Sequence, residues 1–172
     1  MKQLLSLLMA VLFASAAYCQ AYYDALEKQE MATADTMKFH YPFQLQNIDL
    51  CHIPKSVLYT KCYYWLNTIV TSGANVKSHF QIQDKTGGKL MLVKIGYGDN
   101  IYFSVTIDVK EGKYRCTLDD VERLRKVKNG YGWEKVGPYQ QEDRLVMYRI
   151  TKYADGLFAN LHDYVRKDNN NF

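Results

Sequence analysis

Long apolar runs are scarce in this sequence. The longest, residues 4–17, is shorter than the roughly 18 residues that a helix needs to cross a bilayer, so no transmembrane span is predicted. The run follows a short positive start at Lys2 and is ended by Tyr18, Cys19 and Gln20. A positive start, a short apolar stretch and small residues near its end are typical of an export signal, and residues 1–19 are predicted to be one.

Small residues at the last and third-last positions before the cut permit cleavage after Ala17 or after Cys19. Lipidation would instead place the cut before Cys19, but Tyr18 is bulky where a lipoprotein signal normally has Gly, Ala or Ser. We therefore expect an exported protein that is periplasmic or associated with the cell envelope. Membrane anchoring is expected only if Cys19 is lipidated.

A large excess of one charge is also missing. Lys and Arg number 22 against 18 Asp and Glu, and both signs are scattered along the chain, so no strong field for nucleic acid is implied. One basic cluster stands out, formed by Arg123, Arg125, Lys126 and Lys128. It is either a contact for an anion, a lipid headgroup or a polysaccharide, or a strand end paired with nearby acids. The sequence favours the second interpretation, because acidic residues 119, 120 and 122 directly precede it.

No catalytic motif, cofactor motif or metal-ligand cluster is present. The glycines of residues 96–100 lack a third glycine and precede an alternating strand, whereas a dinucleotide site needs a helix there. The four histidines, at positions 40, 52, 79 and 162, are at least 12 residues apart, so none forms a one-turn pair. We expect no catalytic residues, no cofactor and no metal.

Cysteine is sparse, and removal of the signal leaves Cys51, Cys62 and Cys116 in an oxidising compartment. Cys62 falls on the apolar stripe of a predicted helix, where a thiol behaves as a small hydrophobe. That leaves Cys51 and Cys116 as the candidate disulfide. The equally open alternative is that all three thiols are buried and free.

The chain begins, after the signal, with residues 20–37, which mix charges with small residues and are expected to form a tether or a frayed helix. A strand is predicted within residues 39–53. The clearest helix follows at residues 56–72, because its apolar residues recur every three or four positions. They are Leu58, Cys62, Trp65, Leu66 and Ile69.

Four strands are expected next, at residues 78–84, 89–97, 101–110 and 113–121, and glycine-containing turns between them indicate an antiparallel meander. The third shows strict alternation, with apolar residues at 101, 103, 105, 107 and 109. Its polar side is the candidate contact surface. The residues of that surface are Tyr102, Ser104, Thr106 and Asp108.

The C-terminal part is expected to contain a loop or irregular hairpin at residues 129–141, in which Trp133 and Tyr139 cover a core edge, and then a helix at 142–167. Asp155-Gly156 is expected to kink or fray that helix. We predict a single α+β domain over residues 38–168, with two helices on one face of a curved sheet and a polar tail at 169–172.

Several motifs resemble one known family. They are Leu58-Tyr59, Trp65 on the same helix, Tyr102 to Ile107, Lys110 and Gly112-Lys113-Tyr114-Arg115. Together they span residues 48–125 and resemble the domain of unknown function 4468 family, uncharacterised bacterial envelope proteins with a TATA-binding-protein-like (TBP-like) fold. The resemblance implies a strand, a helix, four strands and a helix, and it carries no catalytic residues.

These features favour an exported, non-enzymatic binding or structural module whose partner is an envelope protein or a glycan. The 15 Tyr and 2 Trp invite a glycan, although burial in the core is the expected use of most rings. The alternative is a hydrolase or a lipid- or small-molecule-binding protein with a cavity between sheet and helices. That cavity would have to contain an ionisable group such as His79, Asp108 or His162. DNA binding, suggested only by the fold name, conflicts with export.

Overall fold

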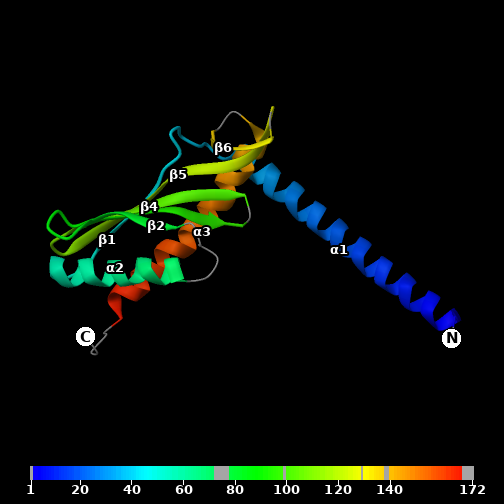
Figure 1. Cartoon of the computed structure of the whole chain (residues 1–172), viewed down its shortest axis with the longest axis horizontal. Coiled ribbons are helices and arrows are strands. Elements are labelled where there is room, and N and C mark those ends of the chain that lie inside the picture. Colours follow the sequence, from blue (N-terminus) through cyan, green and yellow to red (C-terminus); the bar gives the residue numbers. More distant parts are fainter. Residues whose placement is uncertain (1, 72–77, 99, 129, 138–139, 168–172) are drawn as a thin grey trace.

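A computed structural model describes residues 2–71, 78–98, 100–128, 130–137 and 140–167, with side chains from residue 18 onward. Three helices and six strands follow one another along the chain (Figure 1). Their bounds are α1 Lys2–Thr36, β1 Leu45–Leu50, α2 Lys55–Thr71, β2 His79–Asp84, β3 Lys89–Tyr97, β4 Ile101–Lys110, β5 Lys113–Val127, β6 Gly130–Lys135 and α3 Gln141–Arg166.

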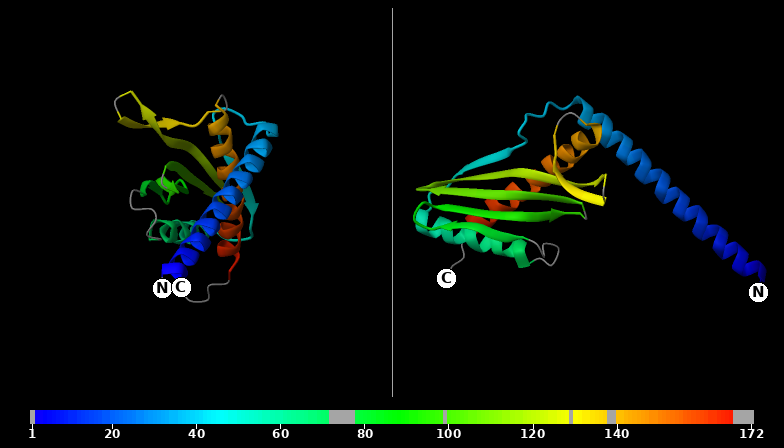
Figure 2. Two further views of the ribbon diagram at one scale, coloured as in Figure 1. Left: turned by 90° about the vertical axis from the view of Figure 1, so that its right-hand side faces the viewer. Right: turned by 45° about the horizontal axis from the view of Figure 1, so that its top comes forward.

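All strands pair antiparallel in one sheet of order β1-β5-β4-β3-β2, and β6 also pairs with β5. Strand β5 is 15 residues long, so its first part pairs with β1 and its last part with β6. Helices α2 and α3 lie on one face of this sheet (Figure 2). The predicted α+β class and antiparallel meander are confirmed.

The core lies between the sheet and these two helices. The predicted stripe of α2 is buried there with the alternate residues Phe103, Val105, Ile107 and Val109 of β4. Trp65 is only 1% exposed, and its indole N–H donates to Asn160 Oδ1 of α3 at 2.8 Å. The indole N–H is the ring's one hydrogen-bond donor, and it has a partner. Trp65 therefore links α2 to α3 without the free-energy cost of burying an unsatisfied donor.

Residues 20–36 belong to helix α1, so of the two alternatives, a tether or a frayed helix, the helix is present, but its end is docked. It is helical to Thr36, and its last turns pack on α3, where Ala34 is fully buried. The Arg144 guanidinium donates to the Ala34, Asp35 and Met37 carbonyls at 2.8 to 3.0 Å, which satisfies orphan acceptors at the helix end. Arg149 Nε donates to Glu30 Oε2 at 2.9 Å. The compact unit therefore begins before residue 38.

In the C-terminal part the hairpin alternative for residues 129–141 is confirmed, because β6 pairs with β5, whereas the expected kink or fraying of the last helix is not seen. Residues 130–135 form strand β6, and α3 continues through Asp155-Gly156 without interruption. Tyr139 and the tail at 169–172 lie outside the described residues. Within the part of the chain that the structure describes, no helix is both long and apolar enough to cross a membrane.

Candidate functional site

The sheet face opposite α2 and α3, called the open face below, carries a row of alternating charges. Asp84, Lys89, Asp108 and Arg115 lie side by side on β2, β3, β4 and β5. Residues directly opposite one another in an antiparallel pair share a face, so the row crosses four strands. Arg115 donates to Asp108 Oδ2 at 2.8 Å. A second row beside it is less charged and contains Ile82, Met91, Thr106, Thr117 and Gln46.

The predicted contact residues of β4 all belong to the open face, but they are not equally accessible. Tyr102, Thr106 and Asp108 are partly exposed, whereas Ser104 is 2% exposed. Ser104 lies opposite Asp119 of β5. Burial, followed by the neighbouring charge of Asp120, raises the pKa of the Asp119 carboxyl. Ser104 is thus too covered to touch a partner.

Aromatic rings gather where the open face meets β6. Tyr102 of β4 and Trp133 of β6 stack across β5 with ring centroids 4.2 Å apart and an interplanar angle of 29°. Lys94 Nζ lies 5.8 Å from the Tyr102 centroid and 2.5 Å from Glu122 Oε2. Trp133 was expected to cover a core edge, but it contributes to this surface instead.

The arginines of the basic cluster turn to the helix side of the sheet. Arg125 pairs with Asp143 at the start of α3, and Arg123 donates to Glu142 Oε2 at 2.6 Å. Asp143 is 3% exposed and also accepts from the Gly137 N–H at 3.0 Å. The expectation that these arginines are paired with acids is therefore correct, but the acids lie on α3 and are not the adjacent residues 119, 120 and 122. Lys126 and Lys128 have no ion-pair partner among the described residues.

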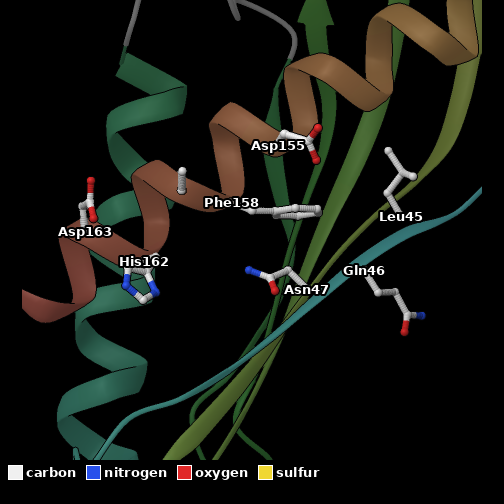
Figure 3. A pocket seen from close by; sticks show the side chains of 8 residues that line it. Leu45, Gln46, Asn47, Asp155, Phe158, His162 and Asp163 are labelled. Atoms are coloured by element: carbon white, nitrogen blue, oxygen red, sulfur yellow. The ribbon is translucent and has the colours of Figure 1, made fainter.

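A cleft of about 520 Å³ opens between the edge strand β1 and α3. Phe158 and His162 project from α3 toward β1, and Asn47 lies on the opposite wall (Figure 3). Asp155 and Asp163 stand at its rim. Among the described residues, no group of three or more His, Cys, Asp or Glu side chains is arranged to hold a metal.

A buried carboxylate beside this cleft fixes the His162 ring. Asp49 Oδ2 lies 2.8 Å from His162 Nδ1 and accepts from the Tyr114 hydroxyl at 3.1 Å, while Arg166 donates to Oδ1 at 3.0 Å. Burial opposes ionisation of Asp49, but the hydrogen bonds from Arg166 and Tyr114 and the positive charge outweigh it and lower its pKa. The carboxylate orients the imidazole and leaves Nε2 as the ring nitrogen that Asp49 does not engage.

The ionisable groups proposed for a cavity are therefore split between three places. His162 borders the cleft, Asp108 lies on the open face, and His79 is exposed on the edge strand β2. The cleft contains one of the three and is open to solvent. A fixed imidazole can accept or deliver a proton, and the described residues that line the cleft include the Asp155 and Asp163 carboxylates but no Ser, Thr, Cys or Lys side chain.

The four cysteines are free thiols in this structure, Cys19 exposed on α1 and the other three buried. The Cys51 N–H donates to the Gly112 carbonyl at 2.8 Å, so Cys51 lies opposite residue 112. Cys116 is four positions further along β5, roughly 13 Å away, whereas a disulfide needs Cα atoms within about 7 Å. The predicted Cys51–Cys116 bridge is not formed in this arrangement. Burial raises the pKa of Cys62 to about 12 and that of Cys116 as well.

Sequence reasoning missed the Asp49 network. Asp49 is separated from Tyr114 by 65 residues and from His162 by 113, so no local spacing joins them. One signal was available: Asp49 occupies an alternating strand, where a carboxylate on the core side needs a partner. The exposed aromatic stack was missed because residues 129–141 were expected to be a loop or an irregular hairpin of unknown register, with Trp133 at a core edge.

No family model matches the sequence, and no curated protein matches it. Ten chains of solved structures match, including two with a TM-score of 0.56. A TBP-like protein from Parabacteroides distasonis is 13% identical, with a TM-score of 0.56 over 73% of this chain and 93% of that chain. A DUF4468 family protein from Bacteroides ovatus is 9% identical, with a TM-score of 0.56 over 74% and 88%. Such low identities establish shape alone, and the chain has the TBP-like fold that the motifs of residues 48–125 predict.

Proposed function

We propose that this protein is exported and acts in the cell envelope as a non-enzymatic binding module, with the open face as its contact surface. The observation that carries the proposal is the difference between the sheet's two faces. Helices α2 and α3 cover one face, while the described helices leave Thr106, Asp108 and their neighbours on the other partly exposed.

The charges of the open face indicate the partner's chemistry. Arg115 is paired with Asp108, Lys94 with Glu122, and Lys135 with Asp120 at 2.7 Å. Charges that are already paired create little net field, so this surface suits a polar polymer with hydroxyl and amide groups and little net charge. It is a poor match for DNA, whose binding requires many uncompensated cations.

The test has two parts. Intact mass of the protein recovered from the envelope fraction should show loss of the signal, and the mature protein should co-sediment with purified cell-wall sacculi or bind envelope polysaccharide. Thr106→Arg, at the centre of the open face, should weaken that binding. Thr68→Arg, exposed on α2, is the matched control and should leave it unchanged. Full-length protein retained in the cytoplasm, or equal binding by both variants, would contradict the proposal.

One observation favours a second candidate function, small-molecule binding in the cleft between β1 and α3. Asp49 fixes His162 at the wall of a cleft that also offers the Asn47 amide and the Phe158 ring. NMR of the ¹⁵N-labelled protein with a fragment library would test it. Shifts confined to residues 45–47 and 155–163, lost in His162→Ala, would support the cleft, and shifts elsewhere would exclude it.

A further inference from the structure

The aromatic end of the open face is not explained by folding. Tyr102, Tyr131 and Trp133 are called the aromatic platform here. Tyr131 and Trp133 are two residues apart on β6, so they share one face of that strand. Trp133 is 36% exposed and Tyr131 is 73% exposed. Among the described residues, the apolar clusters that form the core include none of the three rings.

The strand pairing is irregular on both sides of β4 near Tyr102. The pairing of β3 with β4 shifts register between Leu92 and Ile95, and that of β4 with β5 shifts between Tyr102 and Ser104. Lys94 and Asp120, within these irregularities, have φ of 59° and 54°, a left-handed conformation that side chains other than glycine rarely adopt. Bulges re-aim side chains, and strained residues concentrate at binding sites.

These side chains place hydrogen-bonding groups at the Tyr102 end of the platform. The left-handed Lys94 directs its ammonium to Glu122 and toward the Tyr102 ring, and Asp120 pairs with Lys135 at the end of β6. The result is a set of flat apolar rings with two ion pairs at the Tyr102 end, while Lys126 lies opposite Tyr131 at the other end. The charges of the two pairs cancel, so Lys126 is the one extra cation among the described residues around the rings, and the site offers hydrogen bonds with little net charge.

This arrangement matches the chemistry of a pyranose. One face of a sugar ring presents C–H groups that pack on an aromatic ring, and its equatorial hydroxyls both donate and accept hydrogen bonds. A nucleic acid would also stack, but its phosphates need cations that carboxylates do not already neutralise. An apolar peptide would leave the Glu122 and Lys94 groups desolvated without new partners.

We propose that the aromatic platform binds an uncharged or weakly charged glycan of the envelope, with Trp133 as the main stacking residue. This inference rests on the proposed function, because it assigns the ligand class for one end of the open face. The polymer runs along β6, with successive sugar rings over Trp133 and Tyr131.

The test uses the mature protein and defined glycans. N-acetylchitohexaose, cellohexaose and maltoheptaose would be titrated by calorimetry and by tryptophan fluorescence, in which exposed Trp133 responds and buried Trp65 does not. At least one glycan should bind. Trp133→Ala should weaken that binding by about tenfold or more, as loss of an aromatic anchor does. Trp133→Phe should retain most of it, because a ring remains.

Tyr64→Ala, which removes an exposed ring from α2, is the matched control and should bind like the wild type. Circular dichroism should show all variants folded, since Trp133 lies outside the core. The inference fails, and the proposed function stands, if the mature protein binds sacculi in a Thr106-dependent way while Trp133→Ala is without effect. Both fail if the wild type binds neither the three glycans nor sacculi.

Discussion

The two faces of the sheet are built from alternate residues of the same strands, yet they obey different requirements. In β4, Phe103, Val105 and Ile107 are buried against the helices, while Thr106 and Asp108 alternate with them on the open face. The covered face must exclude water for the chain to fold. The open face does not have to exclude water for folding. Its charged row and aromatic platform are therefore available for contacts with a partner.

The two tryptophans separate these roles most clearly, and the largest expected effect comes from the covered one. Trp65→Ala removes a ring that is 1% exposed together with its hydrogen bond to Asn160. The loss of burial and the cavity left behind should lower the free energy of unfolding by about 3–5 kcal/mol. Urea denaturation followed by circular dichroism measures it.

Trp133→Ala is the counterpart on the open face and should cost less than about 1 kcal/mol, because that ring is outside the core. Similar losses of stability for the two variants would break the comparison. They would mean that the aromatic platform belongs to the fold.

The next largest effect is expected in the hairpin between β2 and β3. Gly88 has φ of +79°, and a Cβ there would lie 2.3 Å from the Val109 carbonyl oxygen. Gly88→Ala combines a steric clash with an unfavourable backbone conformation, so we expect a loss of about 2–4 kcal/mol in the same denaturation assay.

Gly98→Ala is its control, since Gly98 has φ of +61° but no atom within 4 Å of the added Cβ. It should cost only the conformational part, about 1 kcal/mol. Equal effects at Gly88 and Gly98 would show that the clash with β4 is relieved by a local shift.

The sequence predicts the covered side of the molecule better than the rest. The α2 stripe and the β4 alternation are periodic because burial repeats with the helix and strand geometry, so α2 and the three strands β2, β3 and β4 are predicted at nearly their observed bounds. The open side of β4 follows from the same alternation, which is why Tyr102, Thr106 and Asp108 could be assigned to one surface.

The features that the sequence did not predict depend on partners far away along the chain or on interruptions of the strand alternation. The register shift near residues 119–122 interrupts the alternation of β5, so its continuation to Val127 is hidden. The sequence predicts pairing of Arg123 and Arg125 with acids beside them at a strand end. Their partner Asp143 is 18 or more residues away along the chain, so no local pattern indicates it. The docked end of α1 likewise relies on Arg144, more than 100 residues later.

Asp49 is a buried carboxylate on the covered side of the sheet, and it should make the stability of the protein depend on pH. The pKa of Asp49 is below its ordinary value of 3.8, so the ionised carboxylate stabilises the fold above that value, and the contribution is lost as pH falls through the lower folded pKa. Asp49→Asn should cost about 1–3 kcal/mol at pH 7. Denaturation of both proteins between pH 7 and pH 2.5 should show the difference shrinking below about pH 4. A difference independent of pH would show that charge at Asp49 is irrelevant.

The smallest effect is expected on the outer side of the helix layer, where neither the core nor the open face is involved. Gly156 lies inside α3, and no atom comes within 4 Å of an added Cβ. Gly156→Ala should therefore stabilise the protein by about 0.5–1 kcal/mol, because alanine loses less backbone entropy in a helix. Ala159→Gly, at an exposed position of the same helix, should lower stability by a similar amount. The double variant should then match the wild type in thermal denaturation, and a loss of stability in Gly156→Ala would reveal a bend of α3 at Asp155-Gly156 that glycine is needed to form.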